Sequence, residues 1–152
     1  MKKFEFSLAA VLKLRQEKED LARKELVAVV ETLQRLLEEL ERIKKERGEV
    51  EAEFRKKQQE AVQAEDLPIY LDYLQMMRTR MERKQDEIMK TQNIVELKRQ
   101  AVIKAQQQKK MIENIKDKQY AAWQEAIEKK ETEALNDLAT IRFTRDKMVK
   151  HE

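Results

Sequence analysis

The stretch AEDLPIYLDYLQMM, residues 64–77, contains the only proline of a 152-residue chain. Asp66 is suited to cap the N-terminus of a helix, and Pro68 suits its first turn because the missing N–H would have no intrahelical partner there. We therefore predict a helix over 7–64, a turn over 65–68 and a second helix over 68–150. A connection this short favours an antiparallel hairpin. The alternative is one kinked continuous helix that dimerises.

The composition predicts long helices with little core. Charged residues make up 41% of the chain, which has one Gly, one Pro and no Cys, and the mean hydropathy is −0.86. The dominant residue types, Glu, Lys, Gln, Ala, Leu and Arg, are strong helix formers rather than the Pro, Gly and Ser of disordered chains. Burial should therefore follow narrow seams along helices. We predict an all-α fold with a single coiled-coil domain over 1–152, and we do not expect a compact enzyme.

The residues before the turn follow a heptad pattern for about six heptads, which is the signature of a left-handed coiled coil. Ser7 is a candidate N-cap for this helix, and Phe6 and Val11 stand at the positions of a hydrophobic staple. Eleven of the thirteen seam positions are apolar: Ala22, Leu26, Val29, Leu33, Leu36, Leu40, Ile43, Arg47, Val50, Phe54, Lys57, Ala61 and Ala64.

After the turn the same spacing resumes, with a thinner seam in which eight of twelve positions are apolar. The positions are Leu74, Met77, Met81, Lys84, Ile88, Thr91, Val95, Lys98, Val102, Ala105, Lys109 and Ile112. Beyond Ile112 the apolar residues fit an eleven-residue repeat better, and this repeat straightens a helix. We therefore expect the last third of the chain to differ in shape from the rest.

The second helix is longer than the first, so part of it should lack a partner within the chain. Folding about residue 65 or 66 places Leu8 near Trp123 and leaves the residues after about 128 unpaired. That overhang carries apolar residues beside basic ones: Leu138, Ile141, Phe143, Met148, Arg142, Arg145, Lys147 and Lys150. An apolar stripe without an internal partner needs an external one, or it frays.

Catalytic and metal-binding constellations are absent from the sequence. The single histidine, His151, is best explained as a solvated terminal residue, and the chain has no cysteine and no glycine-rich phosphate loop. We predict no enzyme activity, no cofactor, no metal and no small-molecule substrate. No apolar run reaches about 18 residues, and Glu5, Lys13 and Arg15 interrupt the N-terminal apolar stretch, unlike in a secretory signal. These features predict a cytoplasmic protein.

Two clusters have competing explanations. Residues 98–118 carry seven basic and two acidic residues, which is either a solvated face or a phosphate-binding stripe with Tyr120 and Trp123 stacking on bases. The more favoured role of these two aromatic residues is to cover the open end of the hairpin on Phe4 and Leu8. The second cluster consists of Tyr70, Tyr73, Leu74, Met76 and Met77. These are more large side chains than one seam can bury, so they either pack the turn or form an interface with a partner.

Two motifs resemble a known family. FEFSLAAVLKLRQEKED, residues 4–20, is similar to the opening of the FliJ family of flagellar type III export proteins, and YLDYLQMM, residues 70–77, is similar to the aromatic start of that family's second helix. The resemblance covers essentially the whole chain. It implies an antiparallel coiled coil similar to the central stalk of rotary ATPases.

The resemblance also implies partners and sites. The partners are a hexameric flagellar export ATPase, the cytosolic domain of the export-gate membrane protein, and export chaperones, with no nucleic acid. The implied location is cytoplasmic, peripheral to the inner membrane at the flagellar export apparatus. The gate-binding surface corresponds to Tyr70, Tyr73, Met77, Arg80 and Lys84. Our hypothesis for the ATPase ring is a second set: Phe4, Phe6, Leu138, Ile141, Arg142 and Arg145.

Two other functions remain open at this point: a nucleic-acid-binding or tethering coiled coil, and the equivalent stalk of a virulence type III secretion system. Phosphate contacts would make binding fall steeply with salt, whereas an interface built from Tyr and Met would tolerate salt.

Overall fold

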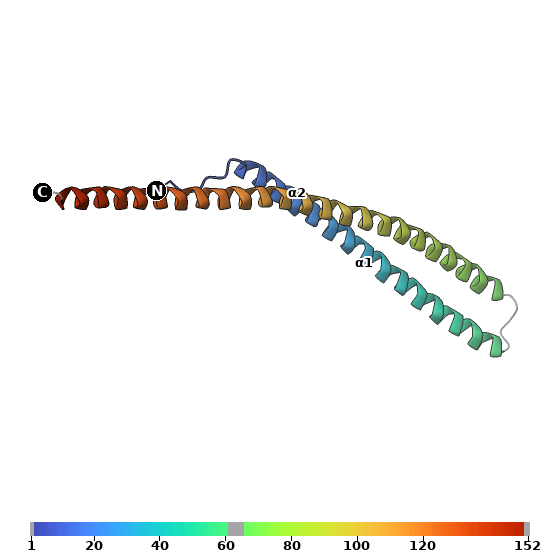
Figure 1. Cartoon of the computed structure of the whole chain (residues 1–152). Helices are drawn as coiled ribbons and strands as arrows, with labels where there is room; N and C mark the ends of the chain where they lie inside the picture. The colour runs from blue at the N-terminus through green and yellow to red at the C-terminus, as the bar shows by residue number, and fades with distance from the viewer. Residues whose placement is uncertain (1, 61–65, 151–152) are drawn as a thin grey trace. The chain divides into compact units, whose positions relative to one another are not determined.

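The computed structural model describes residues 2–60 and 66–150, and these form two long helices and no strand (Figure 1). Helix α1 spans Ala9–Gln59 and helix α2 spans Leu67–Val149. The predicted fold class is confirmed, because the chain is an all-α antiparallel hairpin whose second helix is the longer one. His151 lies outside the described residues, and so do residues 61–65, which comprise the end of the predicted first helix, with the seam positions Ala61 and Ala64, and the first residue of the predicted turn.

The helix ends differ from the predicted ones by a few residues. Helix α1 begins at Ala9, since the first helical hydrogen bond runs from the Leu12 N–H to the Leu8 carbonyl at 2.9 Å. The preceding turn is closed by the Ala9 N–H, which donates to the Phe6 carbonyl at 3.2 Å. At its other end α1 stops at Gln59. Helix α2 begins with Pro68 in its first turn, as predicted, immediately after Asp66.

Residues 18–105 form one compact unit that contains most of the hairpin. Its core cluster consists of Leu36, Leu40 and Ile88, with Leu33 and Met81 packed against them. The other buried apolar residues of this unit are Ile43, Met77, Val95, Val102 and Ala105. All of these lie on the predicted seams. A narrow seam suffices because each buried aliphatic side chain contributes about 1.5–3 kcal/mol.

Polar bonds between the helices recur at every second heptad of this unit. Lys98 Nζ lies 3.1 Å from Glu25 Oε2, and Lys84 Nζ lies 2.7 Å from Glu39 Oε2. One further step along both helices, the Tyr70 hydroxyl donates to Glu53 Oε1 at 3.4 Å. We call these three bonds the polar ladder. Since residue numbers rise along α2 as they fall along α1, the ladder fixes the antiparallel direction and the register.

Residues 1–17 and 106–152 form the second unit. Here Arg15 Nη1 donates to Gln108 Oε1 at 2.9 Å, and the Phe4 ring packs on Trp123 with a centroid distance of 5.8 Å. The register therefore differs from the predicted one, in which Trp123 was placed near Leu8. In the Arg15–Gln108 bond and in the polar ladder the numbers of the facing residues sum to 123, whereas Leu8 and Trp123 sum to 131. The difference is eight residues, about two helical turns, and α1 also ends earlier than predicted, at Gln59 instead of residue 64.

Candidate protein-binding surfaces

The five predicted gate-binding residues have different surroundings in the structure. Tyr73 is 40% exposed, and Arg80 is also exposed. Met77 is completely buried, so it packs the hairpin seam and cannot touch a partner while the hairpin is closed. Tyr70 and Lys84 are partly buried and bond to α1. The hairpin itself therefore engages three of the five residues.

Tyr70 closes the turn end of the hairpin. Its ring packs on Phe54 with a centroid distance of 5.6 Å, and its hydroxyl accepts a hydrogen bond from Lys57. The same hydroxyl donates to Glu53. The bond with Tyr70 raises the pKa of Lys57, which stays charged at neutral pH. Tyr70 thus holds the two helices together near residues 53–57.

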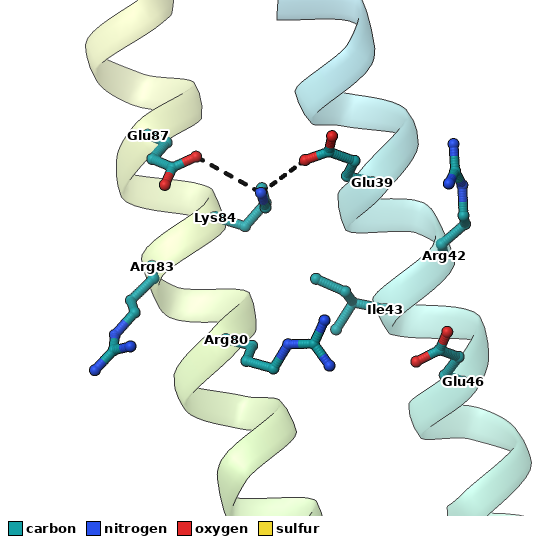
Figure 2. Close-up of a pocket in the computed structure, with 8 residues that line it drawn as sticks. All are labelled: Glu39, Arg42, Ile43, Glu46, Arg80, Arg83, Lys84 and Glu87. Carbon is teal, nitrogen blue, oxygen red and sulfur yellow. Dashed lines mark hydrogen bonds and ion pairs between the residues drawn. The ribbon is translucent and has the colours of Figure 1, made fainter.

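Lys84 and Arg80 line an open groove of about 370 Å³ between the two helices, in which four cationic and three acidic side chains surround one isoleucine (Figure 2). The lining residues are Glu39, Arg42, Ile43, Glu46, Arg80, Arg83, Lys84 and Glu87. At its centre the Lys84 ammonium bridges Glu39 at 2.7 Å and Glu87 at 3.6 Å. Arg80 points toward α1, whereas Arg83 points away from it (Figure 2). The Lys84 ammonium is thus neutralised by two carboxylates.

The Lys84–Glu39 bond shifts the pKa values of both partners in the directions that favour the ion pair. The hydrogen bond from Lys84 lowers the pKa of Glu39, and the hydrogen bond to Glu39 raises the pKa of Lys84. Both groups are partly buried, so solvent screens the pair less than it screens a fully exposed one. At neutral pH this part of the groove is a fixed element of the hairpin.

The N-terminal residues of the predicted ATPase site lie against α2. The Phe4 ring meets Tyr120 edge-on, with a centroid distance of 5.2 Å and an interplanar angle of 77°, in addition to its contact with Trp123. Phe6 is partly buried. The predicted role of Tyr120 and Trp123 as a cover on Phe4 is confirmed by these contacts. Phe4 therefore anchors the N-terminal segment, and both phenylalanines are only partly exposed.

The C-terminal residues of that predicted site are all exposed. Leu138 is 56% exposed and Ile141 is 62% exposed. In the second unit, every described residue from Glu128 to Lys150 is exposed. Ala134, Leu138, Ile141, Arg145 and Met148 follow steps of four and three residues, so they share one face of the helix. We call this face the C-terminal stripe.

Phe143 does not belong to the C-terminal stripe, although it is 68% exposed. It lies two residues after Ile141, which corresponds to about 200° around the helix. Arg142 flanks the stripe, whereas Arg145 lies within it. The structure thus brings Leu138, Ile141 and Arg145 together on one face.

The basic segment 98–118 is partly neutralised within the chain. Lys98 pairs with Glu25 at 3.1 Å, Arg99 with Glu96 at 3.9 Å, and Lys109 with Glu113 at 3.9 Å. Tyr120 and Trp123, which the nucleic-acid hypothesis needs for stacking on bases, pack on Phe4. These contacts favour the interpretation of this segment as a solvated helix face.

Sequence reasoning did not identify the polar ladder or the groove arginines Arg42 and Arg83. The sequence contained a signal for the polar ladder, because Lys84 and Lys98 interrupt the second seam two heptads apart. A lysine at a seam position needs an acidic partner on the facing helix. Which glutamate provides it depends on the register, and the predicted register was shifted by about two helical turns.

Among the described residues, no group of three His, Cys, Asp or Glu side chains could hold a metal ion. Nor does either helix, within its described part, have an apolar stretch that could cross a bilayer. The surfaces described above are the polar groove between the helices and the exposed C-terminal stripe. These features define the class of the protein as a two-helix coiled coil with exposed apolar side chains.

The comparison with known families is specific. The family model described as "Flagellar FliJ protein" matches residues 4–148. The chain belongs to the FliJ family, and its membership implies a function in flagellar type III export, in a family of export components rather than of enzymes. No curated protein and no solved structure matched the chain.

Proposed function

We propose that the chain acts as a stalk-like coiled coil of the flagellar export apparatus, on the cytoplasmic side of the inner membrane. In this role it binds the hexameric export ATPase and the cytosolic domain of the export gate, and it assists the delivery of chaperones and substrates. The main support is the C-terminal stripe, because an exposed apolar face of this length is stabilised only when a partner covers it.

Arg142 and Arg145 suit this stripe to a partner surface that presents acidic groups around apolar ones. Contacts with the ring should be modest in energy, because a ligand that binds one ring conformation too tightly traps it there. Stimulation of ATP hydrolysis would come from a bias among ring conformations, with no catalytic group supplied by this chain.

The test is ATP hydrolysis by the export ATPase with and without this protein. Removal of residues 135–152 should abolish the stimulation. A sharper test is Ile141→Asp, which places a charge in the stripe and should reduce the stimulation strongly. Phe143→Asp is the matched control, because Phe143 is equally exposed on the opposite face of the same helix. Equal effects of the two substitutions, or full stimulation by the truncated chain, would contradict the proposal.

For the gate we propose that Tyr73 and Arg80 make the contacts, since they are exposed on one face of α2, two turns apart. Tyr73→Ala should weaken binding of the gate's cytosolic domain in a calorimetric titration, with the thermal stability of the hairpin unchanged. Arg99→Ala, on another face of the same helix, should leave the affinity unchanged. Retained affinity in the Tyr73 variant would remove this surface from the proposal.

The family model that matches is that of a flagellar protein, which favours the flagellar system over a virulence secretion system. For binding to export chaperones we propose no particular residues. A pull-down of export chaperones with the purified chain tests that part, and it fails if no chaperone is retained.

A further inference from the structure

Helix α2 carries a second row of residues at heptad spacing, beside the seam that packs on α1. The row advances in steps of four and three residues, as a coiled-coil contact surface does. All of its members are exposed. We call it the lateral stripe, and it consists of Ile69, Tyr73, Met76, Arg80, Arg83, Glu87, Lys90, Ile94, Leu97 and Ala101.

Apolar residues occupy both ends of the lateral stripe, and charged residues lie between them. Three apolar residues open it, four charged residues occupy its middle, and three apolar residues close it. The apolar side chains are well exposed, with Ile69 at 67% and Leu97 at 70%. Reversing the direction of the stripe therefore superimposes apolar ends on apolar ends and the charged middle on itself.

From this symmetry we infer that the lateral stripe is a self-association surface, on which a second copy of the chain packs antiparallel about a two-fold axis at the level of residue 85. In such an isologous contact each pair of residues occurs twice. Tyr73 then faces the other copy's Leu97, and Met76 faces its Ile94. Ile69 and Ala101 meet at the two ends.

The charged middle favours the same arrangement. Arg83 faces Glu87 of the second copy, which gives two equivalent ion pairs in addition to the 3.6 Å contact of Glu87 with Lys84 in its own chain. Arg83 points away from α1 and is free to reach outward (Figure 2). Arg80 would face Lys90, a like-charge pair, but the Arg80 side chain points toward α1 (Figure 2), and Lys90 is paired with Asp86 at 3.1 Å in its own chain. Opposite charges therefore meet at the centre, and the like charges are partly compensated.

The size of the surface indicates a weak contact. A stripe from Ile69 to Ala101 is about 48 Å long and about 10 Å wide, the diameter of one helix, which gives about 500 Å² on each copy. The total of about 1,000 Å² lies below the standard size for stable complexes, so the dimer is expected to be weak.

Charge exchange tests the inference on the full-length chain by sedimentation equilibrium across the micromolar range. Arg83→Glu should weaken the dimer about tenfold, because two ion pairs become two repulsions. Glu87→Arg should do the same, and the double variant Arg83→Glu/Glu87→Arg should restore dimerisation. An equimolar mixture of the two single variants should form a heterodimer. Arg99→Glu is the control, since Arg99 lies about 140° around the helix from the stripe.

Disulfide trapping tests the register, and the natural chain has no cysteine to interfere. In the variant Met76→Cys/Ile94→Cys the two thiols lie about 27 Å apart along one helix, which exceeds the reach of a disulfide within a chain. Oxidation should yield covalent dimers. The pair Met76→Cys/Arg99→Cys should remain monomeric, and circular dichroism checks that every variant keeps its helices.

A monomer at every concentration would overturn the inference. So would the absence of rescue in the charge-exchanged double variant, or equal cross-linking in the control pair. Both measurements use the purified chain alone, so they are independent of export partners. One consequence rests on the proposed function: a dimer formed in this way covers Tyr73 and Arg80, and it therefore excludes the gate from them.

Discussion

Met77 allows a direct separation of hairpin stability from partner binding. The family resemblance predicts that this residue binds the export gate, whereas the structure buries it completely in the seam. Met77→Ala removes a side chain whose burial contributes about 1.5–3 kcal/mol. Cavity formation adds to this loss in a globular core, but the flanking residues of a two-helix seam are partly exposed and can close over the gap. We therefore expect a loss of about 2–3 kcal/mol, near the lower limit for such substitutions.

For a chain of this size, about 1 kcal/mol corresponds to 2–4 °C in Tm, so Met77→Ala should lower the melting temperature by about 4–12 °C. Circular dichroism at 222 nm measures this shift. Met77→Leu conserves volume and should cost less than about 1.5 kcal/mol. At a temperature where the variant stays folded, calorimetry should find its affinity for the gate's cytosolic domain nearly unchanged. If Met77→Ala lost gate binding at an unchanged Tm, the reasoning would be refuted, and Met77 would be a residue that contacts the gate.

Three further outcomes are expected. The Lys84–Glu39 pair should stabilise the hairpin between about pH 5 and pH 10: its contribution is lost as pH falls through the lowered pKa of Glu39, below 4.5, and as pH rises through the raised pKa of Lys84, above 10.5. The difference in Tm between the natural chain and the Lys84→Met variant, measured against pH, should shrink at both extremes, and a constant difference would contradict this. Gly48→Ala should raise stability by up to about 1 kcal/mol, since an added Cβ meets nothing within 4 Å and Ala is the better helix former; an unchanged or lower Tm would contradict it. Phe4→Ala should shift the fluorescence of Trp123, the only tryptophan, toward longer wavelength because the covering ring is lost, and an unshifted spectrum would exclude the contact in solution.

Local patterns predicted most of the fold. The spacing of apolar residues identified both helices and placed Leu36, Leu40, Ile88 and Val95 in the seams, where the structure buries them. Pro68 marked the first turn of the second helix. These features depend only on periodicity and on local backbone chemistry.

The register was beyond reach of the same reasoning, because it depends on where α1 ends. A helix end is decided by weak preferences over several residues, and an error there moves every pair of facing residues. The partner of Lys84 could not be chosen for this reason. The gate-binding positions were likewise predicted without knowledge of burial, because a match of residues to the family does not distinguish the buried Met77 from the exposed Tyr73.

The polar ladder also makes the two halves of the chain unlike each other. Both of its lysines lie in the seam of α2, and all of its glutamates flank the seam of α1. If two copies of α2 zipped together in parallel through this seam, Lys84 would meet Lys84 and Lys98 would meet Lys98, so mispairing between newly made chains is disfavoured by repulsion. The charges that align the hairpin thus also favour pairing of α2 with α1 of the same chain over pairing of α2 with α2 of another chain.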